Sequence, residues 1–108
     1  MKRYIKTFKQ NKLANGENLL DVAAPEDKPT ELMFVTDRRV FYFKMNTKDT
    51  AVDKIFEHTA ITNCELSSDA TISQININTA SESMSISKVP NQIAEKIKET
   101  IDGFKSVN

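Results

Sequence analysis

The feature that most constrains the fold is a pair of apolar runs separated by a short polar turn. The runs, ELMFVT at 31–36 and RVFYFKM at 39–45, are joined by Asp37-Arg38. Two apolar runs with such a turn between them predict a β-hairpin. Within each run the consecutive positions are apolar, whereas a strand with one face in water alternates apolar and polar residues. We therefore expect both faces of this hairpin to be covered.

Short apolar runs continue on both sides of the hairpin, at the close spacing that is typical of a β-sandwich or β-barrel. Residues that favour turns separate the runs, as in APEDKP at 24–29. We predict seven strands, at 17–24, 31–36, 39–45, 52–57, 61–67, 71–77 and 82–88. In the sixth strand Ile72 is out of phase with Ile75 and Ile77, and a β-bulge there would restore the phase.

The chain closes with an amphipathic helical pattern. Pro90 suits the start of a helix, and Gly103 suits its C-terminal cap. Apolar residues recur between them at spacings of four, four and three, at Ile93, Ile97, Ile101 and Phe104. We predict a helix over 90–104 that packs on the strands. The expected core comprises Ile93, Ile97 and Ile101 with Phe34, Phe41 or Tyr42, Ile75, Ile77, Met84 and Ile86.

Charge is distributed unevenly along a chain whose formal net charge is zero. Residues 1–16 hold five cations and no acid, a charge of +5, whereas 17–108 hold ten basic and fifteen acidic residues, a charge of −5. Nucleic-acid binding requires a broad basic face, and the acidic body of this chain argues against one. We therefore expect no nucleic-acid partner.

The basic N-terminal segment has a partly helical pattern. Tyr4, Ile5 and Phe8 lie near helical spacing, which predicts a short helical extension over 1–14. This helix would either cover the outer face of the hairpin or rest on an anionic membrane surface. A solvated terminus is the simpler alternative to membrane contact, and we favour it. The cations that we assign to a membrane contact are Lys2, Arg3 and Lys6.

Length and composition exclude several classes of protein. A chain of 108 residues is long enough to form one domain with its own core. Its one cysteine, Cys64, excludes an intrachain disulfide, and no Cys/His group has zinc-site spacing, so we expect no metal or cofactor. No stretch approaches the roughly 20 apolar residues that cross a bilayer, and no signal-peptide core is present. We expect a cytoplasmic protein.

Residues that could carry catalysis are scarce. The one histidine, His58, has no nucleophile or second base placed beside it by a motif, and we interpret it as a polar surface residue at a strand end. Cys64 is interpreted as a small buried apolar residue. The two glycines, Gly16 and Gly103, are isolated and cannot form a phosphate-binding loop. We expect no catalytic residues and no enzymatic activity.

Seven strands followed by one helix is the element order of the pleckstrin-homology (PH) fold. The segments GENLL at 16–20, ELMFVTDRRVFYF at 31–43 and the closing helix resemble the bacterial PH domain family, of the YokE-like type. The resemblance covers about residues 13–106. Its most specific part is the turn Thr36-Asp37-Arg38-Arg39 between the two apolar strands.

The resemblance implies a mainly β fold and a binding role. The expected architecture is a PH-like barrel of seven antiparallel strands in two packed sheets, closed by the C-terminal helix. One domain would span 1–108, with a helical extension at 1–14, the β barrel at 17–88 and the capping helix at 90–104. PH-like domains bind lipids, peptides or proteins, and some bacterial members form homo-oligomers, although a fold alone does not specify a function.

Specific phosphoinositide binding is not expected. The PH domains that recognise these lipids gather several basic residues around the first loop. Here the first loop, 24–29, holds two acids and one lysine, and the strand that follows begins with Glu31 and carries no basic residue. The local field would repel the lipid phosphates.

The arginines of the hairpin turn have two interpretations. Arg38 and Arg39 could form a fork for phosphate or carboxylate. Alternatively Asp37 forms an Asx turn, and one arginine pairs with a nearby acid such as Asp53 or Glu57. We favour the structural interpretation, because turn chemistry accounts for these residue types without a ligand.

The sequence thus favours a non-enzymatic interaction module that contacts another protein or a second copy of itself, through the hairpin 31–45 or through the outer face of the barrel. An exposed apolar face of this size usually marks an interaction surface. The alternative is a peripheral membrane binder that acts through the basic N-terminal helix. The candidate binding residues are Arg38, Arg39, Phe41, Phe43, Lys2, Arg3 and Lys6.

Overall fold

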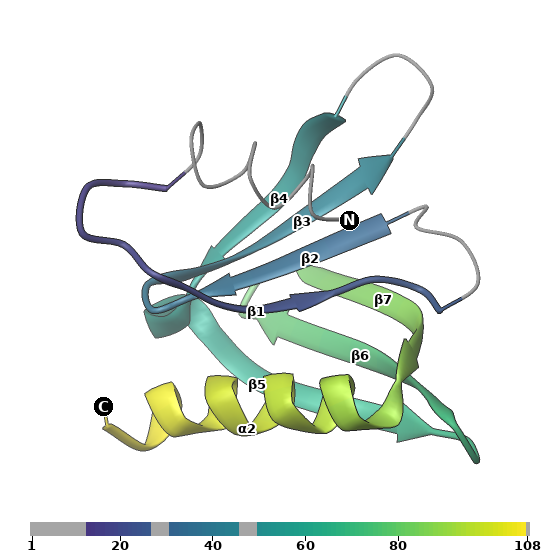
Figure 1. The fold of residues 1–108 in the computed structure, drawn as a ribbon. Coiled ribbons are helices and arrows are strands. Elements are labelled where there is room, and N and C mark those ends of the chain that lie inside the picture. The colour runs from purple at the N-terminus through teal and green to yellow at the C-terminus, as the bar shows by residue number, and fades with distance from the viewer. Residues whose placement is uncertain (1–12, 27–30, 46–49, 108) are drawn as a thin grey trace.

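In this computed structural model the described residues form two antiparallel sheets and one long helix (Figure 1). The structure describes residues 13–26, 31–45 and 50–107. The N-terminal helix expected at 1–14 lies almost wholly outside the described residues. The elements are β1 (Leu19–Ala23), β2 (Glu31–Thr36), β3 (Arg39–Met45), β4 (Thr50–Glu57), the 3₁₀ turn η1 (His58–Ala60), β5 (Ile61–Ser68), β6 (Ile72–Thr79), β7 (Ser83–Pro90) and α2 (Asn91–Val107).

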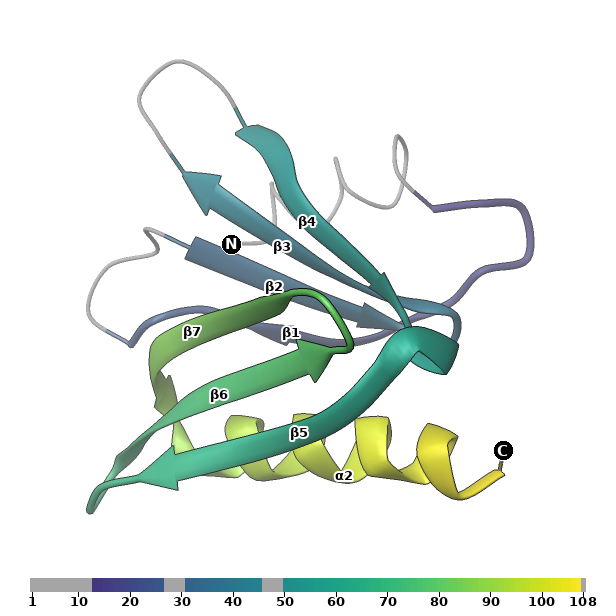
Figure 2. The same ribbon diagram turned by 180° about the vertical axis from the view of Figure 1, so that it is seen from behind.

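The strands form one four-stranded sheet, in the order β1-β2-β3-β4, and one three-stranded sheet, in the order β5-β6-β7. All neighbouring strands are antiparallel. Two packed antiparallel sheets were expected, but within the described residues no strand pairing joins them into a closed barrel. The helix α2 contacts β1 of one sheet and β5 of the other, and it runs alongside both sheets (Figures 1 and 2).

The sequence located the strands well and the connections less well. β2 and β3 match the predicted hairpin at every residue, and the other five strands overlap their predicted ranges. The 3₁₀ turn η1 was not expected. α2 continues through Gly103 to Val107, so the predicted glycine cap was wrong.

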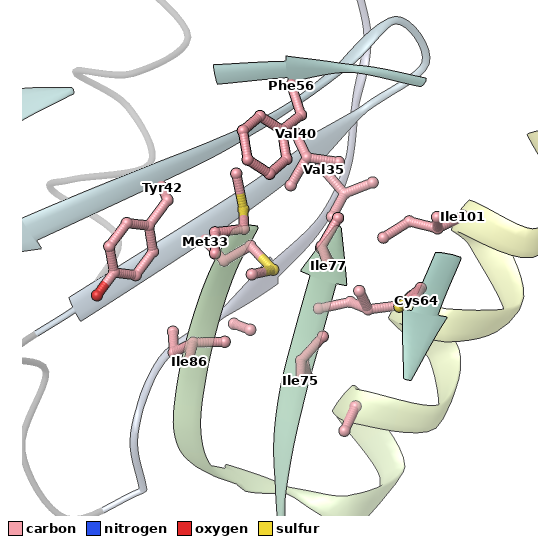
Figure 3. Packing of buried hydrophobic residues seen from close by; sticks show 14 of the residues in the cluster. Met33, Val35, Val40, Tyr42, Phe56, Cys64, Ile75, Ile77, Ile86 and Ile101 are labelled. Carbon is pink, nitrogen blue, oxygen red and sulfur yellow. The ribbon is translucent and has the colours of Figure 1, made fainter. Parts of the chain in front are cut away.

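The main core lies between the two sheets. Figure 3 shows Met33, Val35 and Tyr42 of the four-stranded sheet directed toward Ile77 and Ile86 of the three-stranded sheet. Most of the predicted core residues are confirmed here, namely Tyr42, Ile75, Ile77, Met84, Ile86, Ile97 and Ile101.

The predicted helix stripe was wrong at its first position. Ile93 is 38% exposed, and Ala94 is buried in its place. The buried positions of the helix are therefore Ala94, Ile97 and Ile101, at spacings of three and four.

A second apolar cluster covers the opposite face of the four-stranded sheet. Its members, Leu32, Phe34, Phe41 and Phe43, are each no more than 3% exposed. The rings of Phe34 and Phe43 meet edge to face with centroids 5.4 Å apart. Side chains that pack against the cluster are Leu13, Leu19, Val22 and Ala24. The expectation that both faces of the hairpin are covered is confirmed.

A register irregularity occurs where β6 pairs with β7. Ser73 pairs with Val89 but Ile75 pairs with Ile86, so the extra residue lies in β7. Lys88 there has a φ of 59°, which is unusual for a residue with a side chain. The expected bulge thus lies in β7 and not in β6. In β6, Ser73 is buried on the inner face, whereas Ile72 is only partly buried.

Candidate functional site

The turn between β2 and β3 is held by Thr36. Its Oγ1 accepts hydrogen bonds from the backbone N–H groups of Arg38 at 3.1 Å and Arg39 at 2.8 Å. This is the side-chain-to-backbone pattern of a Ser/Thr turn. The expected Asx turn on Asp37 was wrong, because the threonine one residue earlier supplies the acceptor.

Glu17 binds this turn from the segment that precedes β1. Its Oε1 lies 2.5 Å from Nη2 of Arg39, and its Oε2 accepts from Nε of Arg39 at 3.1 Å and from the Thr36 hydroxyl at 2.6 Å. The fork of the guanidinium thus meets both carboxylate oxygens. These hydrogen bonds, that from Arg39 above all, lower the pKa of the buried Glu17 carboxyl from 4.5 to about 2.

Arg39 therefore has a structural role, as the sequence favoured, and forms an ion pair with Glu17, which was not among the acids named as examples. Of those acids, Glu57 is the cross-strand neighbour of Arg39 and its charge helps to raise the arginine's pKa, whereas the side chain of Asp53 lies outside the described residues. The same guanidinium lies 4.6 Å from the ring centroid of Phe41, so it also covers the outer apolar cluster.

Asn18 joins the same turn through Asp37. The Asp37 backbone N–H donates to the Asn18 carbonyl at 3.0 Å, while the Asn18 backbone N–H donates to Oδ1 of Asp37 at 3.1 Å and its side-chain amide to Oδ2 at 3.0 Å. The hydrogen bonds from Asn18, first of all from its backbone, lower the pKa of Asp37. Glu17 and Asn18 together fasten the start of β1 to the hairpin.

Arg38 differs from its neighbour because it is exposed. No hydrogen bond or ion pair engages its guanidinium within the part of the chain that the structure describes. Its Nη2 lies 3.5 Å from the point where a Cβ would stand on Gly16, and Gly16 has a φ of 83°. The glycine supplies a left-handed backbone directly beneath the arginine.

His58 lies beneath the turn, where η1 turns the chain inward after β4. Its backbone N–H donates to the Arg38 carbonyl at 3.1 Å, and its Nε2 lies 2.8 Å from the Thr36 carbonyl oxygen. The ring stacks on Phe104 of α2, with centroids 4.1 Å apart. His58 is only 6% exposed, so its interpretation as a surface residue was wrong. Burial lowers its pKa.

Two open hollows meet at Phe104. The first, of about 510 Å³, lies beside the turn and is lined by Ala14, Asp37, Arg38, Arg39, Glu57, His58, Thr59 and Phe104. The second, of about 520 Å³, lies between β1 and α2 and is lined by Leu20, Lys96, Glu99, Thr100, Gly103 and Phe104. We name the surface formed by Leu20, Arg38, Thr100, Gly103 and Phe104 the α2-end surface.

The remaining candidate residues are not gathered there. Phe41 and Phe43 are 1% and 3% exposed inside the outer cluster, so their side chains do not form a free surface. Lys2, Arg3 and Lys6 lie outside the described residues. The sequence signals that could have predicted the site are the GEN segment and the threonine of the turn; nothing in the sequence indicated that His58 meets Phe104.

The described ranges contain neither a metal-binding cluster nor a membrane-spanning helix. These residues contain no group of three or more His, Cys, Asp or Glu side chains that could hold a metal ion. Among them, no helix combines the length and the apolar character that a bilayer crossing requires.

The comparisons with known proteins agree with this architecture. A solved structure of a DUF1696 family protein with a pleckstrin-homology domain, from Shewanella loihica PV-4, has a similar fold with a TM-score of 0.66. The match covers 95% of this chain and 94% of the other at 13% sequence identity, so it concerns the fold alone. No curated protein matches the sequence. Residues 5–102 match the family described as Bacterial PH domain, and the chain therefore belongs to that family.

Proposed function

We propose that this protein is a non-catalytic interaction module and that it associates with a second copy of itself through the α2-end surface. The observation that carries this proposal is the exposure of Leu20, 42% of whose surface is open to solvent, at the rim of a hollow that reaches Phe104. An exposed apolar side chain beside an aromatic one forms the kind of hollow that a partner side chain fills.

The α2-end surface replaces the hairpin as the proposed contact. The sequence favoured the second face of 31–45, but Leu32, Phe34, Phe41 and Phe43 are buried in the folded chain. Among the residues whose burial the structure describes, the large apolar side chains that stay more than a third exposed are Leu20, Ile55 and Ile93. Of these, only Leu20 lines a hollow together with the aromatic ring of α2.

Side chains of the chain itself support a second copy as the occupant. The exposed Arg38 belongs to the α2-end surface. On the same chain, Ile55 is 45% exposed and the exposed Glu57 lies two residues further along β4. An apolar side chain next to a carboxylate complements an apolar hollow next to an arginine.

The position of His58 supports the absence of catalysis. Its Nε2 is engaged by the Thr36 carbonyl and its ring is buried against Phe104, so it is not presented to a substrate. A general base must reach the proton that it removes. The protein is accordingly proposed to bind and not to react, in the reducing cytoplasm that its lone cysteine suits.

The test is the solution mass of the full chain, measured by light scattering over a range of concentrations at low and moderate salt. We expect a mass above that of the 12.2 kDa monomer. Leu20→Lys is expected to shift the mass toward the monomer, whereas Ile93→Lys, a matched change on an equally exposed apolar residue away from this surface, is not. A monomer at every concentration, or equal masses for both variants, would contradict the proposal.

A second candidate function is contact with an anionic membrane surface through the basic N-terminal segment. The observation in its favour is the charge of +5 on residues 1–16. Co-sedimentation with vesicles of phosphatidylcholine and phosphatidylserine tests it, with neutral phosphatidylcholine vesicles as the control. Binding that needs the anionic lipid and weakens sharply with salt would favour the membrane, because an apolar protein contact is insensitive to salt.

A further inference from the structure

The one histidine of the chain joins three elements at a single point. His58 begins η1, its Nε2 contacts the Thr36 carbonyl of the β2–β3 turn at 2.8 Å, and its ring lies 4.1 Å from the ring of Phe104 on α2. The last turns of the helix are thus held against the hairpin turn through one imidazole. The packing of the end of α2 therefore depends on whether that imidazole is neutral or protonated.

The contact with Thr36 requires a hydrogen on Nε2, and the state of Nδ1 distinguishes the neutral ring from the protonated one. A carbonyl oxygen only accepts, so Nε2 carries the hydrogen and the neutral ring has its lone pair on Nδ1. That Nδ1 is buried, and it has no hydrogen-bond partner among the described residues. A second proton would therefore create a buried N–H donor, with a positive charge, that has no acceptor, and such a group is costly.

Charged groups around the ring do not supply the missing acceptor. The hydrogen bond to Thr36 and the charge of Asp37 both favour protonation of His58, and burial outweighs them. The carboxylate oxygens of Asp37 already accept from Asn18. Glu57, the residue before His58, is exposed, and Glu17 is held by Arg39. From α2 the ring meets the apolar face of Phe104. The charged groups that face the site are Asp37, Arg38 and Arg39 from the turn and Glu57 from β4.

We propose that His58 is a proton-operated latch: the neutral ring holds the end of α2 against the 36–39 turn, and the protonated ring leaves this position and releases Phe104. Because burial opposes the charged form, the ring should take up its proton only below the usual pKa of 6.5. Since Phe104 lines both hollows, its release would reshape the α2-end surface. The latch does not depend on whether that surface binds a second copy.

The presence of one histidine makes the test direct. In proton–carbon NMR spectra of the full chain, the imidazole gives one set of ring signals, which can be followed as the pH is lowered. We expect a titration midpoint below 6.5, and we expect the ring signals of Phe104 to move in the same step. A midpoint at or above 6.5, or a titration that leaves the Phe104 signals in place, would overturn the latch.

A pair of variants on α2 identifies the cause of the shift. Phe104→Leu removes the stacked ring and admits water, so the His58 midpoint should rise toward 6.5. Ile93→Ala, on the exposed side of the same helix, should leave it unchanged. An unchanged midpoint in Phe104→Leu would also contradict the proposal. If that variant does not fold, the titration of the unaltered chain still decides between the outcomes.

Discussion

The two sheets of this protein differ in how many of their faces are buried. The four-stranded sheet is covered on both faces, by the main core on one side and by the cluster around Phe34 and Phe41 on the other. The three-stranded sheet is covered on its inner face, where Ile75 and Ile77 point into the core, while Asn76 between them points outward. The central strands of the first sheet therefore need consecutive apolar residues, whereas the strands of the second alternate, except where β5 and β7 carry an extra residue.

The outer face of the three-stranded sheet is made of amides and hydroxyls that bond to one another. Asn76 Oδ1 accepts from Gln74 at 2.9 Å and from Ser85 at 2.8 Å, and Asn78 donates to Asn63 at 2.7 Å. Hydrogen bonds between groups that water can also reach add little net stability. We therefore expect that truncating a side chain lowers the free energy of unfolding more on the outer face of the four-stranded sheet than on the outer face of the three-stranded sheet.

The largest effect is expected at the outer face of the four-stranded sheet. Phe34→Ala removes a ring that is 2% exposed and leaves a cavity against Phe43. Truncations of this kind lower the free energy of unfolding by about 3–5 kcal/mol. Urea denaturation followed by circular dichroism measures the loss. A loss below about 1 kcal/mol would mean that this face is not a second core in solution. The two sheets would then not differ in the number of faces that they bury.

The next largest effect concerns acid and the ion pair that fastens the four-stranded sheet. Hydrogen bonds from Arg39 hold the pKa of Glu17 at about 2 in the folded chain, against 4.5 when unfolded. The unfolded chain therefore binds the proton first as the pH falls. Stability from this group is complete above pH 4.5 and is lost toward pH 2, by about 3 kcal/mol in total.

Glu17→Gln supplies the control for this acid dependence. The glutamine keeps the shape of the side chain but has no carboxyl to titrate, so the variant should be less stable at pH 7 and lose less stability between pH 4.5 and 2. Urea midpoints at several pH values compare the two chains. Parallel curves for both would show that other carboxyl groups carry the acid sensitivity.

The same contrast explains what the sequence could predict. Where burial alone decides, the pattern of apolar residues is sufficient, as at β2 and β3, whose limits it predicted at every residue. Alternation identified the buried Ile75 and Ile77 for the same reason. Local periodicity was less decisive in the helix, because Ile93 and Ala94 occupy adjacent positions and both lie near the apolar stripe.

The candidate site could not be predicted because its contacts join residues that are distant in sequence. Glu17 is 22 positions from Arg39, and His58 is 22 positions from Thr36. A local pattern holds no information on which acid forms a two-oxygen contact with an arginine, so Glu17 was not among the expected partners of Arg39. The inward turn of η1 likewise depends on the packing of Phe104 against His58, which no spacing rule encodes.

Replacing each of the two glycines of the chain by alanine should have a smaller effect on stability. Gly16 has a φ of 83° at the joint that fastens the four-stranded sheet. An alanine in this left-handed conformation costs about 1–2 kcal/mol, so Gly16→Ala should lower the thermal midpoint. A midpoint equal to that of the unaltered chain would mean that the joint adjusts its backbone freely.

Gly103, on the helix that covers the three-stranded sheet, should respond in the opposite direction. It lies inside α2, and a Cβ added to it meets nothing within 4 Å. Because glycine is the poorer helix former, Gly103→Ala should stabilise the fold by up to about 1 kcal/mol. Differential scanning calorimetry of both variants should show a lowered thermal midpoint for Gly16→Ala and a raised one for Gly103→Ala. A lowered midpoint for Gly103→Ala would argue that this turn of α2 must bend.

The smallest effect is expected on the open face of the three-stranded sheet. Asn76→Ala removes the acceptor that Gln74 and Ser85 share, but both donors lie where water can replace it. The free energy of unfolding should change by no more than about 0.5 kcal/mol, against several for Phe34→Ala on the other sheet. Urea denaturation resolves a difference of that size between the two variants. If Asn76→Ala instead costs as much as a core truncation, this amide-rich face is itself buried in solution, and a partner that covers it would have to be sought.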